Sequence, residues 1–336
     1  MRKPYVLLLS LCWLFSGLAV TPARAADNGS WSVHPVSSRV AVRPYFSLFA
    51  DPGRRIADKM VIANKTAEPR TFRLYAADAY NTARDGGFAV RSPGERMRGV
   101  GAWARPARSR ITVPGHGTVT VPFTLRVPAD AEPGDHPGAL VAIDERIESG
   151  AGSAALGVRR AVGARVYLRV SGPALPALAV EHVRISHQQP LVPGLGDSTA
   201  VISYTLHNTG NVTLDPQVEL GVRGMFGRTL LARDLTGLPA ELLPGQRVRL
   251  TAPWRNPPQL DWGKVTLTAH ATGTRQSASA SFLALPWLVA AVAAAVAATG
   301  VTLLARARRS RTRRPSVPAG PSRPSRPAPT TPDRTG

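Results

Sequence analysis

The sequence contains one cysteine in 336 residues, Cys12. A single cysteine can form neither a disulfide within the chain nor a metal site of several thiolates. Cys12 also lies in an apolar N-terminal segment that we expect to be removed, so the mature protein is expected to have no thiol chemistry. Leu11 precedes it where a lipoprotein site needs a small residue, so no lipid anchor is expected. The fold must then be held by its hydrophobic core.

Signatures of common catalytic sites are absent as well. The sequence has no H-E-x-x-H, no G-x-S-x-G, no G-x-x-x-x-G-K-[ST] and no G-x-G-x-x-G after a predicted strand. We therefore predict that the protein is not an enzyme and has no catalytic, cofactor-binding or metal-binding residues. Because catalytic triads assemble across space, a hydrolase with a dispersed site stays open as a lesser alternative.

Acidic and aromatic residues are scarce: 21 Asp and Glu face 42 Lys and Arg, and aromatic residues make up 6%. Nine arginines and one aspartate follow from position 306, while thirty basic and twenty acidic residues lie within 27–281. A basic chain often binds nucleic acid. Here the arginine cluster directly follows an apolar segment, so membrane topology explains it and no nucleic-acid partner is predicted. The moderately basic exported part suits an anionic wall or lipid surface.

The N-terminus has the composition of a signal peptide. A basic pair precedes the apolar run 6–20, which is short for a membrane span. The sequence Ala23-Arg24-Ala25 then supplies the small-x-small pattern of a cleavage site. We predict a signal peptide over residues 1–26, cleaved after Ala25 or Ala26.

A second apolar segment, 283–305, has no charged residue in 23 positions. At about 1.5 Å per residue a helix of this length crosses a hydrocarbon core of about 30 Å, and arginines that follow a span mark its cytoplasmic end. We predict one transmembrane helix over 283–305 and a disordered, basic cytoplasmic tail over 306–336. The protein is then a single-pass, type I protein of the cell membrane with an extracellular ectodomain.

Apolar and polar residues alternate with a period of two between these segments. The clearest example, 118–127, predicts an antiparallel strand with one buried face, formed by Val119, Val121, Phe123, Leu125 and Val127. Pro122 cannot donate to a ladder, so this strand is expected at a sheet edge or with a bulge. Similar strands are expected over 58–64, 70–78 and 164–170, separated by turns.

The stretch SGPALPAL, 171–178, is typical of an interdomain linker. Beyond it, a strand with Ile202, Tyr204 and Leu206 on one face precedes a turn at 207–211, where Asn and Gly suit the positive φ of a tight hairpin. The order strand, Asn-containing turn, strand and Pro-Gly turn occurs in both halves. We predict an all-β fold of two tandem immunoglobulin-like β-sandwiches, 27–172 and 173–281.

Four segments between Trp31 and Ser171 carry a further signal: WSVHPV, PYFSLFADPGRRIADKMVIANKTAEPRTFRLYAADA, ARDGGF and WARPARSRITVPGHGTVTVPFTLRVPADAEPGDHPGALVAI. Their order resembles the DUF916 family, the peptidoglycan-binding domain of WxL-interacting proteins. The order of signal peptide, two domains, span and basic tail is also similar to that family, in an actinobacterial, membrane-anchored form. The resemblance implies a non-enzymatic surface protein that contacts peptidoglycan and has a partner-binding second domain. It assigns no ligand residues.

The stretch PADAEPGDHPGAL, 128–140, places Asp130, Glu132, Asp135 and His136 within seven residues. Such a cluster suits a metal site or a catalytic pair. Its prolines and glycines favour instead a corner that connects two adjacent strands of the first sandwich, with Asp135 bracing a turn.

Other polar residues carry weaker signals. His182 and His187 fall on opposite faces of a predicted strand and are expected to be solvated or at the strand's end, and His116 between two glycines is expected to be exposed. The spacing of Asp78, Asn81 and Asp85 does not match that of a calcium loop, and Asp85-Gly86 is suited to a tight turn. The aromatic residues Tyr75, Tyr80 and Trp103 suit either stacking on sugar rings or half-buried packing.

These features together predict a membrane-anchored cell-surface binding or scaffold protein. Its ectodomain would contact cell-wall glycan, namely peptidoglycan, or another surface component such as a surface protein. The alternative is an accessory subunit of a cell-wall enzyme or transporter that acts through a membrane partner, because the span is rich in small residues that allow close helix packing.

Overall fold

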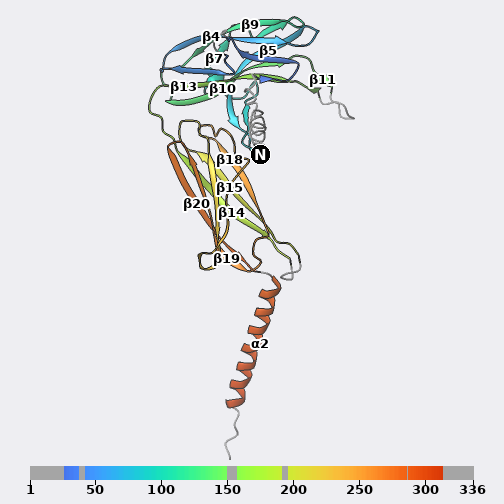
Figure 1. Ribbon diagram of the computed structural model, residues 1–336, viewed down its shortest axis with the longest axis vertical. Helices are drawn as coiled ribbons and strands as arrows, with labels where there is room; N and C mark the ends of the chain where they lie inside the picture. Colours follow the sequence, from blue (N-terminus) through green and yellow to red (C-terminus); the bar gives the residue numbers. More distant parts are fainter. Residues whose placement is uncertain (1–25, 38–41, 150–156, 191–195, 286, 313–336) are drawn as a thin grey trace, which may run out of the picture.

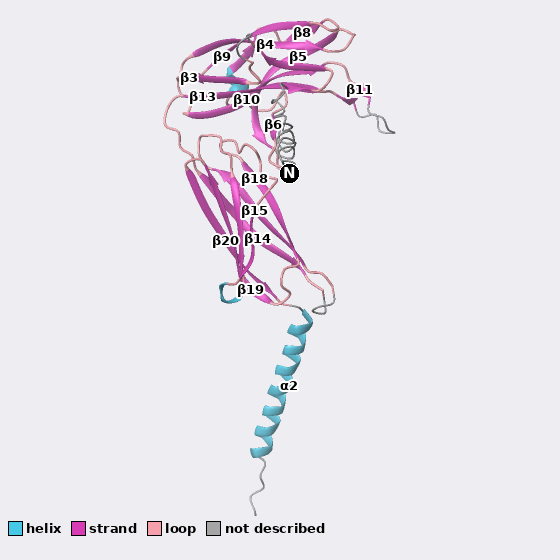
Figure 2. Cartoon of the chain, in the orientation of Figure 1, coloured by secondary structure: helices cyan, strands magenta, loops and turns pink. Residues whose placement is uncertain are grey.

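The computed structural model describes residues 26–37, 42–149, 157–190, 196–285 and 287–312. Two β-sandwiches in tandem are followed by one long apolar helix (Figure 1). Strands make up most of both sandwiches (Figure 2). The predicted all-β class, with two immunoglobulin-like sandwiches before an apolar helix, is confirmed. The predicted signal peptide up to Ala25 lies outside the described residues, and Ala26 begins the first strand.

Two sheets form the first sandwich. One has the strand order β1-β2-β4-β9-β7, and the other has the order β3-β13-β10-β5, with β6 and β8 both pairing with the far edge of β5. Among the described strands of this sandwich, only β3 and β13 pair in parallel. The strands are β1 (Ala26–Asp27), β2 (Trp31–Pro35), β3 (Phe46–Ala50), β4 (Arg55–Asn64), β5 (Arg70–Asn81), β6 (Phe88–Val90), β7 (Ala104–Pro106), β8 (Arg110–Val113), β9 (Thr118–Arg126), β10 (Gly134–Asp144) and β13 (Ala161–Val170). Two short strands between β10 and β13, β11 (Glu148–Ser149) and β12 (Gly157–Val158), pair with each other in a separate two-stranded sheet.

The second sandwich packs a sheet of order β14-β15-β18 against a sheet of order β17-β16-β19-β20. All pairs in it are antiparallel. The strands are β14 (Leu178–Gln188), β15 (Thr199–Asn208), β16 (Gln217–Arg223), β17 (Thr229–Asp234), β18 (Arg247–Arg255), β19 (Asp261–Ala271) and β20 (Thr274–Ala284). One 3-10 turn, η1 (Met225–Gly227), joins β16 to β17.

Each sandwich has a core formed by its own strands. In the first, Trp31 and Phe72 lie 5.4 Å apart between ring centroids, and Phe46 and Phe123 lie 5.1 Å apart. Fully burying one side chain of this kind stabilises the fold by about 1.5–3 kcal/mol. Of the predicted inward residues Val119 is only partly buried. The others are buried in both halves, namely Val121, Phe123, Leu125, Val127, Val166, Leu168, Val170, Ile202, Tyr204 and Leu206.

Pro122 does not place β9 at a sheet edge, and the register of β9 with β4 runs without a bulge. The prediction was wrong because the three-residue β7 covers β9 from Phe123 to Leu125. Pro122 is tolerated just beyond that pairing. Its carbonyl accepts the N–H of Ala107 at 2.9 Å. The nitrogen and the carbonyl of one residue in an antiparallel strand point to the same side, so the Pro122 nitrogen also faces Ala107, just beyond the end of β7.

An asparagine at the end of a strand locks the Pro-Gly turn of each sandwich. Asn64 ends β4, and its Nδ2 donates to the carbonyls of Val113 at 3.2 Å and Pro114 at 3.0 Å. Asn208 ends β15, and its Nδ2 donates to the carbonyl of Leu242 at 2.8 Å, just before the second Pro-Gly turn. Both asparagines are buried, and a buried amide needs such partners. This shared requirement explains why the same order of turns occurs in both halves.

The stretch 128–140 is not a corner between adjacent strands. It leads from β9 in one sheet to β10 in the other, so it crosses the sandwich. β10 begins at Gly134, with a φ of 122°, and Asp135 and His136 lie inside the strand. The sequence pattern did not reveal the start of β10, because the first residues of this strand are polar. Asp135 belongs to the strand through its pairing with Arg169 and not through apolar burial.

Asp135 joins the two sandwiches and does not brace a local turn. Its carboxylate accepts two hydrogen bonds from the Arg169 guanidinium, at 2.6 and 3.0 Å. Oδ2 also accepts the N–H of Thr213 at 2.8 Å, and the N–H of Asp135 donates to the carbonyl of Asn211 at 2.7 Å. Gly134 is required beside it, because a Cβ there would lie 2.2 Å from the same Asn211 oxygen.

Asn211 also fixes the linker between the sandwiches. Its Nδ2 donates to the carbonyls of Pro133 and Pro173, each at 2.9 Å. Its Oδ1 accepts the N–H of Leu175 at 2.7 Å. One side chain therefore connects the approach to β10, the linker and the turn after β15.

The segment 207–211 is not a hairpin, because β15 and the following strand β16 lie in different sheets. None of its described residues has a positive φ. Gly210 is needed for a different reason: a Cβ there would lie 2.2 Å from the carbonyl oxygen of Leu175 in the linker. The prediction of a tight hairpin was wrong because close approach, and not turn geometry, selects the glycine.

A second set of contacts joins the sandwiches through Glu241. Asn81 donates from Nδ2 to the Glu241 carbonyl at 2.7 Å and accepts the N–H of Leu243 at 2.9 Å. The Tyr167 hydroxyl donates to the Glu241 carboxylate at 2.8 Å. Burial, together with the charge of Glu241, raises the pKa of Tyr167 to about 12, so the hydroxyl remains a donor at ordinary pH.

Helix α2 (Trp287–Thr312) leaves the lower end of the second sandwich (Figure 1). Among the described residues it is the helix long and apolar enough to cross a membrane, with a candidate span of Leu288–Arg309 and no buried part. The helix begins at Trp287 and not at residue 283 as predicted, and it extends beyond residue 305 to Thr312. Leu283 and Ala284 belong to β20, and the helix continues through the arginines, which are good helix formers, into the predicted disordered tail.

We expect Asp135→Ala to lower the free energy of unfolding by about 1–3 kcal/mol, because the N–H of Thr213 loses its acceptor. The Arg169 side chain is about half exposed, so its ion pair adds little to this. Urea unfolding measures the change, and limited subtilisin digestion of the linker 171–177 measures how far the junction opens.

Asp130→Ala is the matched control, because Asp130 is an exposed acid of the same stretch. Equal stability and equal protease resistance of the two variants would show that Asp135 does not join the sandwiches.

Candidate functional site

A groove of about 700 Å³ lies at the junction of the two sandwiches. The first sandwich contributes the end of β5, the segment 91–99 and the start of β10. The second contributes the turn at 210–211 and the Pro-Gly turn at 243–246. The interdomain hydrogen bonds described above therefore determine the shape of this groove.

Arginine side chains line the groove on the side of the first sandwich. Arg91 is paired with Glu95 at 3.1 Å and lies over the Tyr80 ring at 5.8 Å from its centroid. Arg96 and Arg98 are exposed, and neither guanidinium has a hydrogen-bond or ion-pair partner in the described part of the chain. The groove thus presents two uncommitted positive charges.

Asp78 holds the arginine-bearing segment in place. Its carboxylate accepts the backbone N–H groups of Arg98 at 2.5 Å, Gly99 at 3.1 Å and Gly101 at 2.7 Å. It therefore caps the short helix α1 (Val100–Trp103), in the way that acidic residues cap helix N-termini. All of these hydrogen bonds of the carboxylate come from backbone N–H groups, so Asp78 positions the segment.

His136 faces the same groove and is also committed. Its Nε2 lies 2.8 Å from the carbonyl oxygen of Glu132, which fixes Nε2 as the donor, and its ring lies 4.7 Å from Trp103. The groove thus gathers several residues of the polar clusters noted in the sequence: Asp78, Glu132, Asp135 and His136. Within the described residues, no group of three or more His, Cys, Asp or Glu side chains is arranged to hold a metal ion.

Two other candidates have structural roles nearby. Asn81 is buried in the interdomain contact. Asp85-Gly86 forms the predicted tight turn, with a φ of 71° at Gly86 and a bond from the Gly87 N–H to Asp85 Oδ1 at 3.0 Å.

The aromatic candidates Tyr75, Tyr80 and Trp103 are each partly buried, as packing residues are expected to be. His116 is exposed, as predicted, and has a φ of 52°.

Of the two histidines of β14, His182 is exposed as predicted, and His187 differs from the prediction. The strand is bulged between Glu181 and Arg184, and His182, with a φ of 54°, is exposed. His187 is not solvated: its ring stacks on Phe282 at 5.6 Å and meets Trp254 at 6.2 Å. Neither of its ring nitrogens has a hydrogen-bond partner in the described residues, and burial lowers the pKa of His187.

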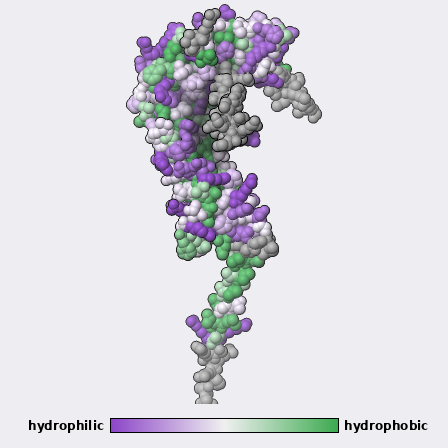
Figure 3. Space-filling view, viewed as in Figure 1, coloured by the Kyte–Doolittle hydropathy of each residue, from purple (hydrophilic) through white to green (hydrophobic). Residues whose placement is uncertain are grey.

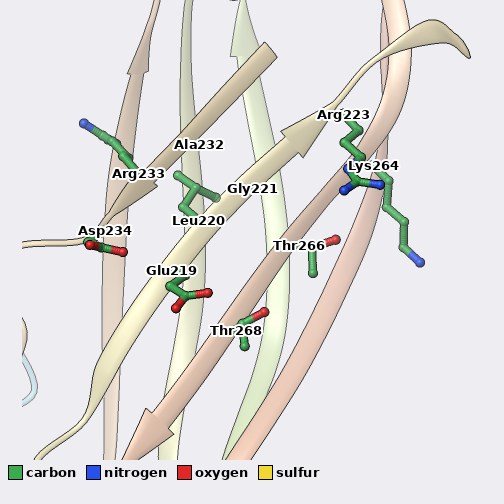
Figure 4. Close-up of a pocket in the computed structure, with 10 residues that line it drawn as sticks. All are labelled: Glu219, Leu220, Gly221, Arg223, Ala232, Arg233, Asp234, Lys264, Thr266 and Thr268. Carbon is green, nitrogen blue, oxygen red and sulfur yellow. The ribbon is translucent and has the colours of Figure 1, made fainter. Parts of the chain in front are cut away.

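A second, shallow groove of about 750 Å³ lies on the outer face of the sheet β17-β16-β19-β20 (Figure 4). Gly221 and Ala232 form its floor, because the absence of large side chains at these paired positions leaves a hollow. Charged and hydroxyl side chains surround it, namely Glu219, Arg223, Arg233, Asp234, Lys264, Thr266 and Thr268. The two acids, Glu219 and Asp234, are paired at one end of the groove, and Arg223 and Lys264 are paired at the other end.

No family model and no curated protein matches the chain. Among solved structures it is similar to the class 5 fimbriae chaperone CfaA, with 9% identity over 76% of this chain and 99% of that chain and a TM-score of 0.34. A chain of the CsuC–CsuE chaperone–tip adhesion subunit complex of Acinetobacter baumannii shares 9% identity over 74% of this chain and 97% of that chain, with a TM-score of 0.34. The CupB2 chaperone of Pseudomonas aeruginosa shares 11% identity over 71% and 97%, with a TM-score of 0.29. Likeness at these scores carries no argument about function.

We expect His187 to make stability depend on pH. The pKa of His187 is lower in the folded protein than in the unfolded chain, so the unfolded chain binds the proton more readily. The contribution of neutral, buried His187 to the free energy of unfolding is therefore fully present above about pH 6.5, the pKa of a free histidine, and is lost as the pH falls below it. Urea unfolding of the wild type and of His187→Phe between neutral and acidic pH should show a smaller loss in the variant.

His182→Phe is the control, since it removes an exposed histidine from the same strand. If His182→Phe and His187→Phe reduce the acid-induced loss equally, the buried position of His187 has no special effect.

Proposed function

We propose that this chain is a membrane-anchored cell-surface binding or scaffold protein whose ectodomain contacts the peptidoglycan-containing wall. The observation that carries the proposal is the groove at the junction of the sandwiches, in which the guanidinium groups of Arg96 and Arg98 are unpaired within the described residues. Helix α2, long and apolar enough to cross a membrane, would hold this groove at a fixed position on the cell surface.

The chemistry of the groove suits an anionic and extended ligand. Guanidinium groups bind carboxylates and phosphates through paired hydrogen bonds, and cell walls carry carboxylates on their peptide stems. The committed roles of Asp78 and His136 favour binding over catalysis, because both side chains hold the backbone in place.

The resemblance to the DUF916 family supports the same groove as the site of wall contact. Segments that resemble DUF916, namely the end of β5 and the stretch 128–140, supply part of the first-sandwich side of the groove, and the arginine-bearing segment 91–99 lies between them in the sequence. Contact with peptidoglycan, which that resemblance implies, would then occur where these segments meet the second sandwich.

A second function, that of an accessory subunit in a membrane complex, is favoured by the surface of α2. Between 290 and 300 this surface is formed largely by exposed alanines, which permit close packing against another helix. Replacing Ala294 and Ala298 with leucine should leave membrane insertion unchanged and abolish co-purification of a membrane partner. Co-purification that survives the change would contradict this second function.

We expect Arg96→Glu/Arg98→Glu to reduce retention of the full-length, detergent-solubilised protein on isolated bacterial cell walls several-fold. The reason is reversal of both unpaired charges in the groove, and the difference should shrink at high salt because exposed charges are screened. Sedimentation with walls, before and after removal of wall phosphate polymers, measures the retained fraction and tells carboxylate from phosphate binding.

The matched control is Arg54→Glu/Arg126→Glu, which makes the same charge change at exposed positions of the first sandwich outside the groove. Equal loss in both double variants would mean that net charge alone retains the protein. No retention of the wild type at low salt would contradict wall binding itself.

A further inference from the structure

The end of the second sandwich next to α2 has an exposed apolar surface. Phe226 is fully exposed, and Trp262 and Leu283 are 55% and 66% exposed. Leu260 and Leu285 are exposed beside them in the chain. Apolar residues gather at this end in the space-filling view, where the sandwich meets the helix (Figure 3). We call these five residues the basal patch.

The strand register places part of the basal patch at the end of one sheet face. Along the outer face of β19 and β20, the paired residues are Thr266 with Ser279, then Lys264 with Ser281, then Trp262 with Leu283. The face is therefore polar along its length and becomes apolar only at its last pair. β20 ends one residue later, and α2 begins at Trp287.

Phe226 reaches the same end of the sandwich from another loop. It lies in η1, which follows β16, and the last pair of β16 with β19 is Arg223 with Lys264. A Cβ on Gly263 would lie 1.9 Å from the carbonyl oxygen of Arg223, so the end of β16 packs closely on the start of β19. Figure 2 shows this short helical turn at the lower end of the second sandwich, the end from which α2 leaves.

The conformation of η1 is held by a buried carboxylate. Asp261 is fully buried, and it accepts the N–H of Met225 at 2.9 Å and a guanidinium N–H of Arg228 at 2.9 Å. Burial alone opposes its charge, but these hydrogen bonds outweigh burial and lower the pKa of Asp261. Phe226 itself has a φ of 56°, which is costly for a residue other than glycine. The loop is thus braced in a strained form that keeps an aromatic ring in solvent.

We propose that the basal patch inserts into the lipid headgroup region of the membrane that α2 crosses. The inference rests on the membrane anchoring in the proposed function. It commits to lipid because the patch is continuous with the candidate span, which begins at Leu288. Aromatic side chains prefer the interface between water and lipid, and the flanking Arg223, Arg228 and Lys264 suit anionic headgroups.

Contact at this end gives the two joined sandwiches, which we call the arm, a second attachment to the membrane beside α2. If the second sandwich were joined to the membrane only through α2 and the short connection before it, the sandwich would be free to tilt on the membrane. Insertion of Phe226, in the loop after β16, and of Trp262, on β19, prevents that tilt. The interdomain groove, at the opposite end of the second sandwich, is then presented at a fixed height above the lipid.

The test uses spin labels on the full-length chain in nanodiscs that contain anionic lipid. Cys12 is changed to Ser, so single cysteines at Phe226, Trp262, Thr266 and Val296 can each be labelled. Accessibility to oxygen, which dissolves in lipid, is compared with accessibility to a water-soluble nickel chelate. We expect the ratio to be several-fold higher at Phe226→Cys and Trp262→Cys than at Thr266→Cys, which lies higher on the same sheet face.

The label at Val296→Cys distinguishes a failure of the proposed membrane anchoring from a failure of the proposed insertion of the basal patch. If it is accessible to the nickel chelate, α2 does not span the membrane and the proposed anchoring fails. If it is deep in lipid while the labels at 226 and 262 report water, anchoring stands and the basal patch does not insert. If those two labels are shielded from both reagents, or are broadened by a label on a second copy, protein covers the patch and the inference is overturned.

Discussion

The structure depends on the hydrogen bonds through which Asp135 and Asn211 join the two sandwiches. Asp135 accepts the N–H of Thr213 at 2.8 Å, and Asn211 bonds to Pro133, Pro173 and Leu175 within 2.9 Å. Gly134 and Gly210 allow the close approach that these bonds require, since a Cβ on either would lie 2.2 Å from a backbone oxygen. Without them only the linker and the contacts of Asn81 and Tyr167 around Glu241 would connect the sandwiches, and the side of the groove formed by 133–135 and 210–211 would lose its shape.

Polarity changes along the arm in a way that fits its proposed place between wall and membrane. The junction groove carries unpaired arginines, the outer face of the second sandwich is rich in hydroxyl and charged groups, and the basal patch is apolar. Helix α2 continues the apolar surface (Figure 3). The two proposals use opposite ends of the second sandwich and share one requirement, that the arm is stiff enough to relate them.

Sequence patterns predicted what depends on neighbouring residues. Alternation identified β9, β13 and β15 together with their inward side chains, and the matched Asn and Pro-Gly turns reflect the same buried amide in each sandwich. The pattern missed what depends on distant residues. Asp135 and Thr213 are 78 positions apart, so a cluster that resembled chemistry is an interdomain contact. The bulge at His182 likewise altered the faces of β14. No sequence pattern marked Arg96 and Arg98 as candidate binding residues, because exposed arginines follow no periodic pattern along the chain.

The distance between one spin label on each sandwich tests the stiffness of the arm most directly. With Cys12 changed to Ser, labels at Ser109→Cys and Ser277→Cys occupy exposed positions of the first and second sandwich. Double electron–electron resonance on the full-length protein in nanodiscs should give one narrow distance distribution that salt does not broaden. A broad distribution, of the kind that two domains on a free linker produce, would contradict the account of a fixed arm.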